Sequence, residues 1–356
     1  MDRYGIDHHK LHYHPQRVAD WLAGRTVWPI YMELSPAGAC NHRCTFCGLD
    51  YVGYQTRFLA WDMLRERIAE LGRLGLKSLM HGGEGEPLLH RDLPRIVEHG
   101  HACGIDQALT TNGVLFTEDA ARRILPHSEW VKVSINAGTR ETYAAIHRTK
   151  PADFDIVLAN IERAAALRAR HGWGCTLGLQ MVLLPENRAE AATLAARARE
   201  LGADYLVIKP YSQHPRSETT TYKDVRYHDD QALAEALARE ATDRFQVILR
   251  ARTMRKWDEQ DHPYNRCLAL PFWSYVDAGG NVWGCSVYLG DERFRYGNLY
   301  EQTFRQIWEG ERRRRHLDWV ARELDARTCR LNCRMDEANR YLWALQREPP
   351  PHVNFI

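Results

Sequence analysis

The sequence predicts an α/β fold in the form of a partial (β/α)6 barrel of the TIM type, on three observations. Between residues 28 and 210, short apolar runs alternate with segments of helical periodicity. Six such runs follow one another at the spacing of parallel strands joined by right-handed crossovers. Glycine-rich or polar turns follow several of them, and folds of this kind bind ligands at the C-terminal ends of their strands.

The elements follow in order along the chain. The predicted strands cover residues 28–34, 77–80, 106–109, 131–135, 176–184 and 205–208. The predicted helices between them cover residues 63–74, 93–102, 118–125, 154–168 and 189–201. After Pro210 the pattern ends: residues 211–228 are polar and loop-like, and a helix is expected at residues 230–242.

The last third of the chain predicts a small extension to the barrel. The turn sequence Ala278–Gly279–Gly280–Asn281 lies between two short apolar runs, which indicates a hairpin. A helix is expected at residues 300–314, and the prolines at 349–351 exclude a helix at the tail.

Composition argues against several classes of function. The chain has 44% hydrophobic and 26% charged residues and a formal net charge of +2, so charge gives no reason to expect a nucleic-acid partner. No apolar stretch approaches the roughly 18 residues that a membrane span needs. The N-terminus is polar and His-rich, unlike a secretory signal. We therefore expect a cytoplasmic protein without a membrane partner.

Nine cysteines are present, and their clustering indicates metal binding in a reducing compartment. Cys40, Cys44 and Cys47 stand at x3 and x2 spacing just after the first predicted strand. Three thiolates on a [4Fe–4S] cluster leave one iron without a protein ligand. The alternatives are a redox pair or a zinc knuckle that recruits His42 as its fourth ligand.

The C-x3-C-x2-C motif, with an aromatic residue (Phe46) before its last cysteine, resembles the signature of the radical S-adenosylmethionine (SAM) superfamily. The resemblance covers residues 28 to about 210. It implies a SAM-binding [4Fe–4S] cluster held by these cysteines, SAM itself as cofactor, and reductive cleavage of SAM to a 5′-deoxyadenosyl radical. It also implies a flavodoxin- or ferredoxin-type reductant as partner.

Further motifs of that superfamily follow in order. Residues 82–87, GGEGEP, are similar to its "GGEP" loop, with Glu86 the closer counterpart of the motif's glutamate and Glu84 the alternative. Residues 111–113 are similar to its "TNG" turn. The SAM-binding residues that the resemblance implies are Gly83, Glu84, Gly85, Glu86, Thr111, Asn112, Ser134, Asn136, Arg148, Lys150 and Gln180.

A second set of cysteines, Cys267, Cys285, Cys329 and Cys333, resembles the SPASM or twitch extension of the same superfamily. Four thiolates saturate one auxiliary [4Fe–4S] cluster, and four cysteines could equally hold a structural zinc ion. The expected organisation is a lead-in (1–27), the barrel (28–228), a connecting helix and strand (229–266), the auxiliary cluster domain (267–340) and a tail (341–356).

The substrate is the least determined feature. The polar loop after the sixth strand offers Lys209, Tyr211, Gln213, His214 and Arg216 as substrate contacts. The lead-in is short for a leader-peptide-binding module, which favours a small molecule. The chain is similar to radical enzymes that act on carbohydrates, cyclitols or nucleosides in natural-product and antibiotic biosynthesis.

The reaction expected from this similarity is decarboxylation, dehydration or dehydrogenation, which makes the enzyme a lyase or an oxidoreductase. A cytosylglucuronic acid decarboxylase is the best single match. The alternatives are a peptide- or protein-modifying radical enzyme, a noncatalytic electron carrier and a zinc-bound interaction module.

Overall fold

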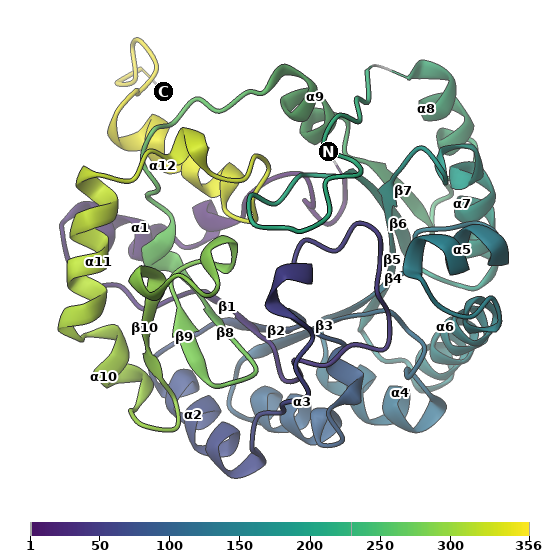
Figure 1. Ribbon diagram of the computed structural model, residues 1–356, viewed down its shortest axis with the longest axis horizontal. Helices are drawn as coiled ribbons and strands as arrows, with labels where there is room; N and C mark the ends of the chain where they lie inside the picture. The colour runs from purple at the N-terminus through teal and green to yellow at the C-terminus, as the bar shows by residue number, and fades with distance from the viewer. Residues whose placement is uncertain (1, 229, 356) are drawn as a thin grey trace.

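The computed structural model describes residues 2–228 and 230–355. Within them, ten strands form one sheet in the order β10-β9-β8-β1-β2-β3-β4-β5-β6-β7, which curves into an open ring with helices outside it (Figure 1). The strands are β1 (Tyr31–Leu34), β2 (Ser78–His81), β3 (Asp106–Thr111), β4 (Trp130–Ser134), β5 (Thr176–Leu183), β6 (Tyr205–Pro210), β7 (Gln246–Leu249), β8 (Trp273–Val276), β9 (Asn281–Trp283) and β10 (Arg295–Asn298).

Helices follow most of the parallel strands and pack on the outer face of the sheet (Figure 1). They are α1 (Pro15–Leu22), α2 (Trp61–Arg73), α3 (Leu93–Ala102), α4 (Glu118–Ile124), α5 (Arg140–His147), α6 (Ala152–His171), α7 (Ala191–Glu200), α8 (Gln231–Ala238), α9 (Ala251–Glu259), α10 (Phe304–Trp308), α11 (Glu311–Arg322) and α12 (Asp336–Gln346).

The predicted fold class is confirmed. Each of the six predicted strands and the five helices between them is present with small shifts of its ends, and the six strands β1 to β6 are parallel neighbours. The parallel array is longer than predicted, because β7 pairs with β6 and β8 pairs with β1 in the same direction. The predicted hairpin at residues 278–281 joins β8 to β9.

Some details differ from the expectation. The helix predicted at residues 300–314 is two helices, α10 and α11, separated at Gly310, which caps the second. The expected boundary at residue 340 falls inside α12. Four helices were not predicted: α1, α5, α9 and α12. Charged side chains connect two of them, since Lys256 of α9 lies 2.5 Å from both Asp336 and Glu337 of α12.

The outer face of the sheet forms the largest core. Val131 and Val133 of β4 and Leu206 and Ile208 of β6 are fully buried in one cluster with residues of α4, α6 and α7. Because side chains alternate between the two faces of a strand, the residues between these apolar ones face the inside of the ring. The packing therefore points Trp130, Lys132 and Ser134 of β4 inward, along with Lys209 of β6.

Asn187 fixes the turn at the C-terminal ends of β4 and β5. Its fully buried amide donates to the carbonyls of Asn136 and Val182 at 2.7 and 2.8 Å and accepts from the Leu184 amide at 2.8 Å. Since three backbone groups lose their partner in Asn187→Ala, we expect the free energy of unfolding to fall by about 3 kcal/mol. Anaerobic urea unfolding followed by circular dichroism measures it.

The matched control for that prediction is Gln231→Ala, which removes an exposed amide bonded to Glu235 one helical turn away. It should change the free energy of unfolding by less than about 0.5 kcal/mol. An Asn187→Ala loss no larger than that of the control would show that the turn does not depend on this side chain.

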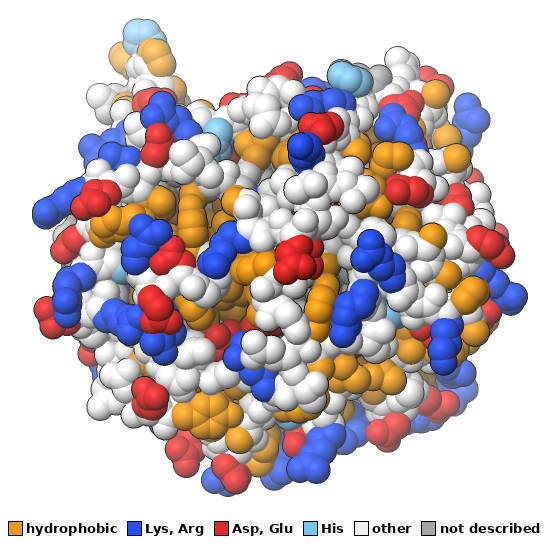
Figure 2. Space-filling view, in the orientation of Figure 1, with side chains coloured by type: hydrophobic (Ala, Val, Ile, Leu, Met, Phe, Trp, Pro, Cys, Tyr) orange, Lys and Arg blue, Asp and Glu red, His pale blue; other side chains and the backbone are white. Residues whose placement is uncertain are grey.

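The C-terminal ends of the strands open toward the viewer in Figure 1, and η2 (Asp50–Val52) lies across that opening. Figure 2 shows the same face in space-filling form, with charged side chains around the rim and hydrophobic ones in a recess near the centre. No helix in the described parts of the chain is both long and apolar enough to cross a lipid bilayer.

Candidate functional site at the mouth of the barrel

The loop after β1 carries the first three cysteines to the mouth of the barrel. Its backbone is fastened to the end of α5, because the Arg43 and Thr45 amides donate to the carbonyls of His147 and Ile146 at 3.1 and 2.8 Å. Burial raises the pKa of the Cys40 thiol to about 11, and burial together with the neighbouring Cys47 and Cys40 thiols raises that of Cys44 well above its usual value. Three converging thiols that resist ionisation suit a cationic iron–sulfur core, which stabilises their thiolate form.

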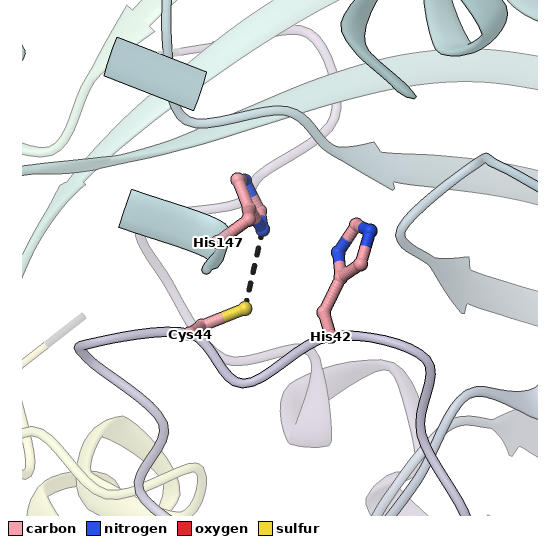
Figure 3. A group of neighbouring side chains, drawn as sticks. All are labelled: His42, Cys44 and His147. Atoms are coloured by element: carbon pink, nitrogen blue, oxygen red, sulfur yellow. Dashed lines mark hydrogen bonds between the residues drawn. The ribbon is translucent and has the colours of Figure 1, made fainter. Parts of the chain in front are cut away.

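Two histidines flank Cys44, as Figure 3 shows. The Nδ1 atom of His147 lies 3.1 Å from the Cys44 sulfur, and its Nε2 lies 3.0 Å from the Ile135 carbonyl and 3.3 Å from the Asn136 amide nitrogen. His42 is buried next to them, and its two ring nitrogens form no hydrogen bond with any described residue, although Nε2 is 3.7 Å from Asp153. The ligand atoms of His42, Cys44 and His147 all lie within 4.8 Å of one another, so they could also hold a single metal ion.

The GGEGEP loop after β2 packs tightly against the cysteine loop. A Cβ atom on Gly85 would lie 2.1 Å from the Ala39 carbonyl oxygen, and Gly83 has a φ of +104° and would meet the Tyr275 hydroxyl at 2.4 Å. Only glycine fits at these two positions. The predicted loop glycines therefore have a structural reason: they let this loop lie directly against the segment that leads to Cys40.

The two glutamates of this loop have different surroundings. Glu86 accepts from the Thr111 hydroxyl at 2.6 Å and the Asn112 amide at 2.8 Å, and its charge adds to the burial that raises the pKa of Cys40. Glu84 instead pairs with Arg57 at 3.0 Å and accepts from the Ala278 amide at 2.7 Å. Glu86 thus lies with the cysteine loop and the TNG turn, whereas Glu84 ties the β8–β9 hairpin to the barrel.

Strand ends bring most of the other expected SAM-binding residues to the same mouth. The Asn112 amide donates to Asn41, inside the cysteine loop, at 2.6 Å, and Gln180 Nε2 is 3.4 Å from the Ser134 hydroxyl. Asn136 is fully buried, and its Oδ1 accepts from the Val182 amide at 2.7 Å. Arg148 ends α5 in the left-handed conformation (φ 50°), and Lys150 is exposed.

The second set of cysteines also converges. Cys267, Cys285, Cys329 and Cys333 line one largely apolar cavity with Leu270, Trp273 and Phe294. Asn339 donates to the Cys267 sulfur at 3.5 Å, and the Tyr288 hydroxyl is 2.9 Å from the Cys329 sulfur. Burial raises the pKa of Cys267 to about 11 and, with the charge of Asp336, that of Cys333 to about 12. The donor set fits a buried cationic cluster.

The polar loop after β6 is occupied with the protein itself. The Tyr211 hydroxyl donates to Gln213 at 3.0 Å, His214 stacks on Tyr51 and is buried, and Arg216 donates to the Leu289 carbonyl at 2.6 Å. Lys209 differs, because its ammonium group makes no hydrogen bond or ion pair with any part of the chain that the structure describes. Of the five expected substrate contacts, Lys209 keeps a free polar group at the mouth.

Several residues at the mouth or inside the barrel were not singled out from the sequence: Glu33, Lys132, His147, Arg330 and Arg334. Arg334, next to Cys333, reaches into the ring and pairs with Glu33 of β1 at 2.9 Å. The sequence could have predicted that Lys132 faces the inside of the barrel, because it lies in the alternating run WVKVS, where the two valines face the core. The other residues meet through tertiary contacts that no local pattern reports.

Comparison with protein families gives two matches. Residues 34–198 match the family model described as the radical SAM superfamily. Residues 267–334 match the SPASM model, described as an iron–sulfur cluster-binding domain. The first match covers the strands and loops that carry Cys40 to Gln180, and the second covers the four later cysteines.

Similar proteins are known by sequence and by structure. The GTP 3′,8-cyclase of Chlorobaculum tepidum is 29% identical over 196 residues, which are 54% of this chain and 56% of that protein, so the match spans about half of that relative. The AdoMet-dependent heme synthase of Methanosarcina barkeri is 26% identical over 306 residues, 81% of this chain and 84% of that protein. The crystal structure of Streptococcus suis SuiB bound to precursor peptide SuiA has a TM-score of 0.62 at 15% identity, covering 84% of this chain and 69% of that one, which is a likeness of fold.

Proposed function

We propose a function from an established premise: the chain belongs to the radical SAM superfamily and carries a SPASM-type iron–sulfur domain. Its cofactors are therefore SAM, the [4Fe–4S] cluster that binds it and auxiliary iron–sulfur, and it is a radical SAM enzyme. The proposal concerns which residues hold these groups and what class of molecule the enzyme acts on.

We assign the SAM-binding cluster to Cys40, Cys44 and Cys47 and one auxiliary cluster to Cys267, Cys285, Cys329 and Cys333. The single observation that supports this is the convergence of the first three thiols, with Glu86 and Asn112, at the mouth of the barrel. The SAM-bound cluster supplies one electron that cleaves the sulfonium and yields a radical able to abstract hydrogen from a carbon atom.

The protein's own residues then bind and orient. We propose that Glu86, held by Thr111 and Asn112, faces the ammonium group of SAM, and that Ser134 and Gln180 contact its polar groups from the strand ends. Glu84 has a different role in this proposal: its bonds to Arg57 and Ala278 brace the auxiliary domain against the barrel.

We further propose a compact substrate: a carbohydrate, cyclitol or nucleoside that undergoes decarboxylation, dehydration or dehydrogenation. Support comes from contacts between two loops at the mouth of the barrel. The Ser217 hydroxyl donates to the Cys47 carbonyl at 3.1 Å and to Asp50 at 2.9 Å, and Thr219 donates to the Thr45 carbonyl at 3.1 Å, so the loop after β6 is fastened to the cysteine loop. Because these two loops are fastened to each other at the opening, we expect a small molecule to enter more easily than a folded partner.

Mass spectrometry of turnover mixtures tests this proposal. Reconstituted protein, SAM and dithionite are mixed with a panel of sugars, cyclitols and nucleosides, and each is scored for product and for 5′-deoxyadenosine formed together with it. The proposal expects coupled formation with at least one panel member. Coupled formation with a peptide substrate alone would support the alternative, a peptide-modifying enzyme.

His147 offers a separate prediction about the first cluster. A Cys44 thiolate has no proton, so it forms a hydrogen bond with His147 only when Nδ1 carries the ring proton. Nε2 then accepts from the Asn136 amide, and the Ile135 carbonyl, 3.0 Å from Nε2, receives no hydrogen bond from the neutral ring. Hydrogen bonds to cluster sulfurs stabilise the more negative reduced state. We expect His147→Phe to lower the reduction potential of the cluster by on the order of tens of millivolts, measured by a redox titration followed by electron paramagnetic resonance. The control is His42→Phe, whose ring forms no such bond; equal shifts in both variants would contradict the prediction.

A further inference from the structure

Two lysines inside the barrel have no acidic partner among the described residues. Lys132 of β4 and Lys209 of β6 both point into the ring, since their strand neighbours Val131, Val133 and Ile208 are buried in the outer core. On β5, which lies between them, Lys132 pairs with Gly178 and Lys209 with Val182. The two lysines therefore lie at two depths of the same interior face.

Neither ammonium group has an acidic partner within the described residues. Lys132 contacts the Trp130 ring at 5.3 Å, and Lys209 makes no hydrogen bond or ion pair. Burial, followed by the charges of Lys132 and of Arg250, Arg330 and Arg334, lowers the pKa of Lys209 well below its usual value. Cations gathered away from water are costly unless an anion accompanies them.

The nearby arginines and acids do not cancel this charge. Glu33, which faces Lys132 from β1, already pairs with Arg334 at 2.9 Å, and Arg250 pairs with Asp7 at 2.8 Å. Arg330 bonds to neutral groups, the carbonyl and hydroxyl oxygens of Ser212 at 2.9 and 3.3 Å. Lys132 and Lys209 thus have no acidic partner among the described residues, and burial lowers the pKa of both amines. An anion bound beside them and Arg330 would restore their charged form.

Their position connects them to the reaction site. A Cβ atom on Gly48, the residue after Cys47, would lie 3.6 Å from an Arg330 guanidinium nitrogen. Lys132 precedes Ser134, an expected SAM contact, by two residues, so it lies about 7 Å deeper along the strand. A molecule below SAM in the ring can reach the lysines and still present a carbon atom to the mouth.

We propose that the substrate carries an anionic group, a carboxylate or a phosphate, that Lys132, Lys209 and Arg330 bind inside the barrel. The inference rests on the proposed function and names the substrate class of the same site. Charge-assisted hydrogen bonds from ammonium and guanidinium groups are the strongest that a protein makes to either anion. The other anion that could meet these cations is the carboxylate of SAM itself, so the test separates the two.

Ligand-observed NMR on the reconstituted protein with SAM provides the test. The probes are D-glucuronate for a carboxylate, D-glucose 6-phosphate for a phosphate and D-glucose as the neutral control. We expect at least one charged probe to bind at least tenfold more tightly than glucose, and which one binds identifies the anion. Lys132→Met and Lys209→Met should each weaken that binding by roughly tenfold to a hundredfold, whereas Lys209→Arg should restore most of it.

The matched control is Lys77→Met, an exposed lysine before β2, at the opposite end of the strands; its binding should equal that of the parent protein. Iron content and circular dichroism check that each variant is folded and loaded. The inference is wrong if neither charged probe binds better than glucose, if the lysine variants bind like the control, or if they lose affinity for SAM and not for the probe. Failure of the parent protein to release 5′-deoxyadenosine, measured separately, would instead reject the proposed function.

Discussion

Cys44→Ala should abolish reductive cleavage of SAM and remove about four irons per chain. Cys44 is the central thiol of the first set: its pKa is raised chiefly by burial and then by Cys47 and Cys40, and the ring of His147 lies 3.1 Å from its sulfur. Two thiolates and a methyl group cannot hold a cubane that keeps one iron open for SAM. The measurement is 5′-deoxyadenosine release under dithionite, together with iron and sulfide analysis.

Cys103→Ala is the matched control. Cys103 ends α3, packs against a cluster of buried apolar residues from α2, α3 and β2, and belongs to neither cysteine set. This variant should keep both its iron and its SAM cleavage. If Cys44→Ala cleaves SAM at the rate of this control, Cys44 does not hold the cluster and the assignment of the first site fails.

Cys329→Ala should distinguish the role of the auxiliary cluster from that of the SAM-binding cluster. Its sulfur lines the auxiliary cavity and lies 2.9 Å from the Tyr288 hydroxyl, in a domain other than the one that carries Cys44. We expect this variant to lose auxiliary iron and product formation, and to retain SAM cleavage at the first site. The readouts are iron per chain, 5′-deoxyadenosine and product, each compared with the Cys103→Ala control.

Three results would contradict that expectation. A Cys329→Ala protein with full iron and full product formation would remove Cys329 from the cluster. Recovery of product on addition of zinc would favour the structural zinc alternative. Loss of SAM cleavage with the first cluster intact would mean that the auxiliary site supports the first step.

Much of the barrel could be predicted because its signals are local. Each of the six strands from β1 to β6 is a short apolar run. The glycine-rich turn after β2 lies where its backbone must come close to another segment of the chain. Gly83 and Gly85 illustrate this, since their close contacts with Tyr275 and Ala39 exclude any side chain. Cysteine spacing predicted the first set, whose three members lie within eight residues. The second set is spread over residues 267–333 and was predicted from its resemblance to the SPASM or twitch extension; its four thiols line one cavity.

Other features depend on contacts between distant segments, which no local pattern reports. β8 pairs with β1 although more than 200 residues separate them, so the auxiliary domain continues the barrel sheet. α9 and α12 are held together by Lys256, Asp336 and Glu337, in contacts between residues 80 and 81 positions apart in the chain. Arg334 directly follows Cys333 and is the last residue of the SPASM match. Nothing in its local sequence predicts that it pairs with Glu33 inside the barrel.

The most direct test of the account is electron paramagnetic resonance of the anaerobically reconstituted, reduced protein, recorded without and with SAM. The account predicts a [4Fe–4S] signal that changes shape when SAM is added, and that is missing from the Cys40→Ala, Cys44→Ala, Cys47→Ala triple variant. A spectrum that SAM leaves unchanged, or a triple variant that keeps the SAM-responsive signal, would contradict it.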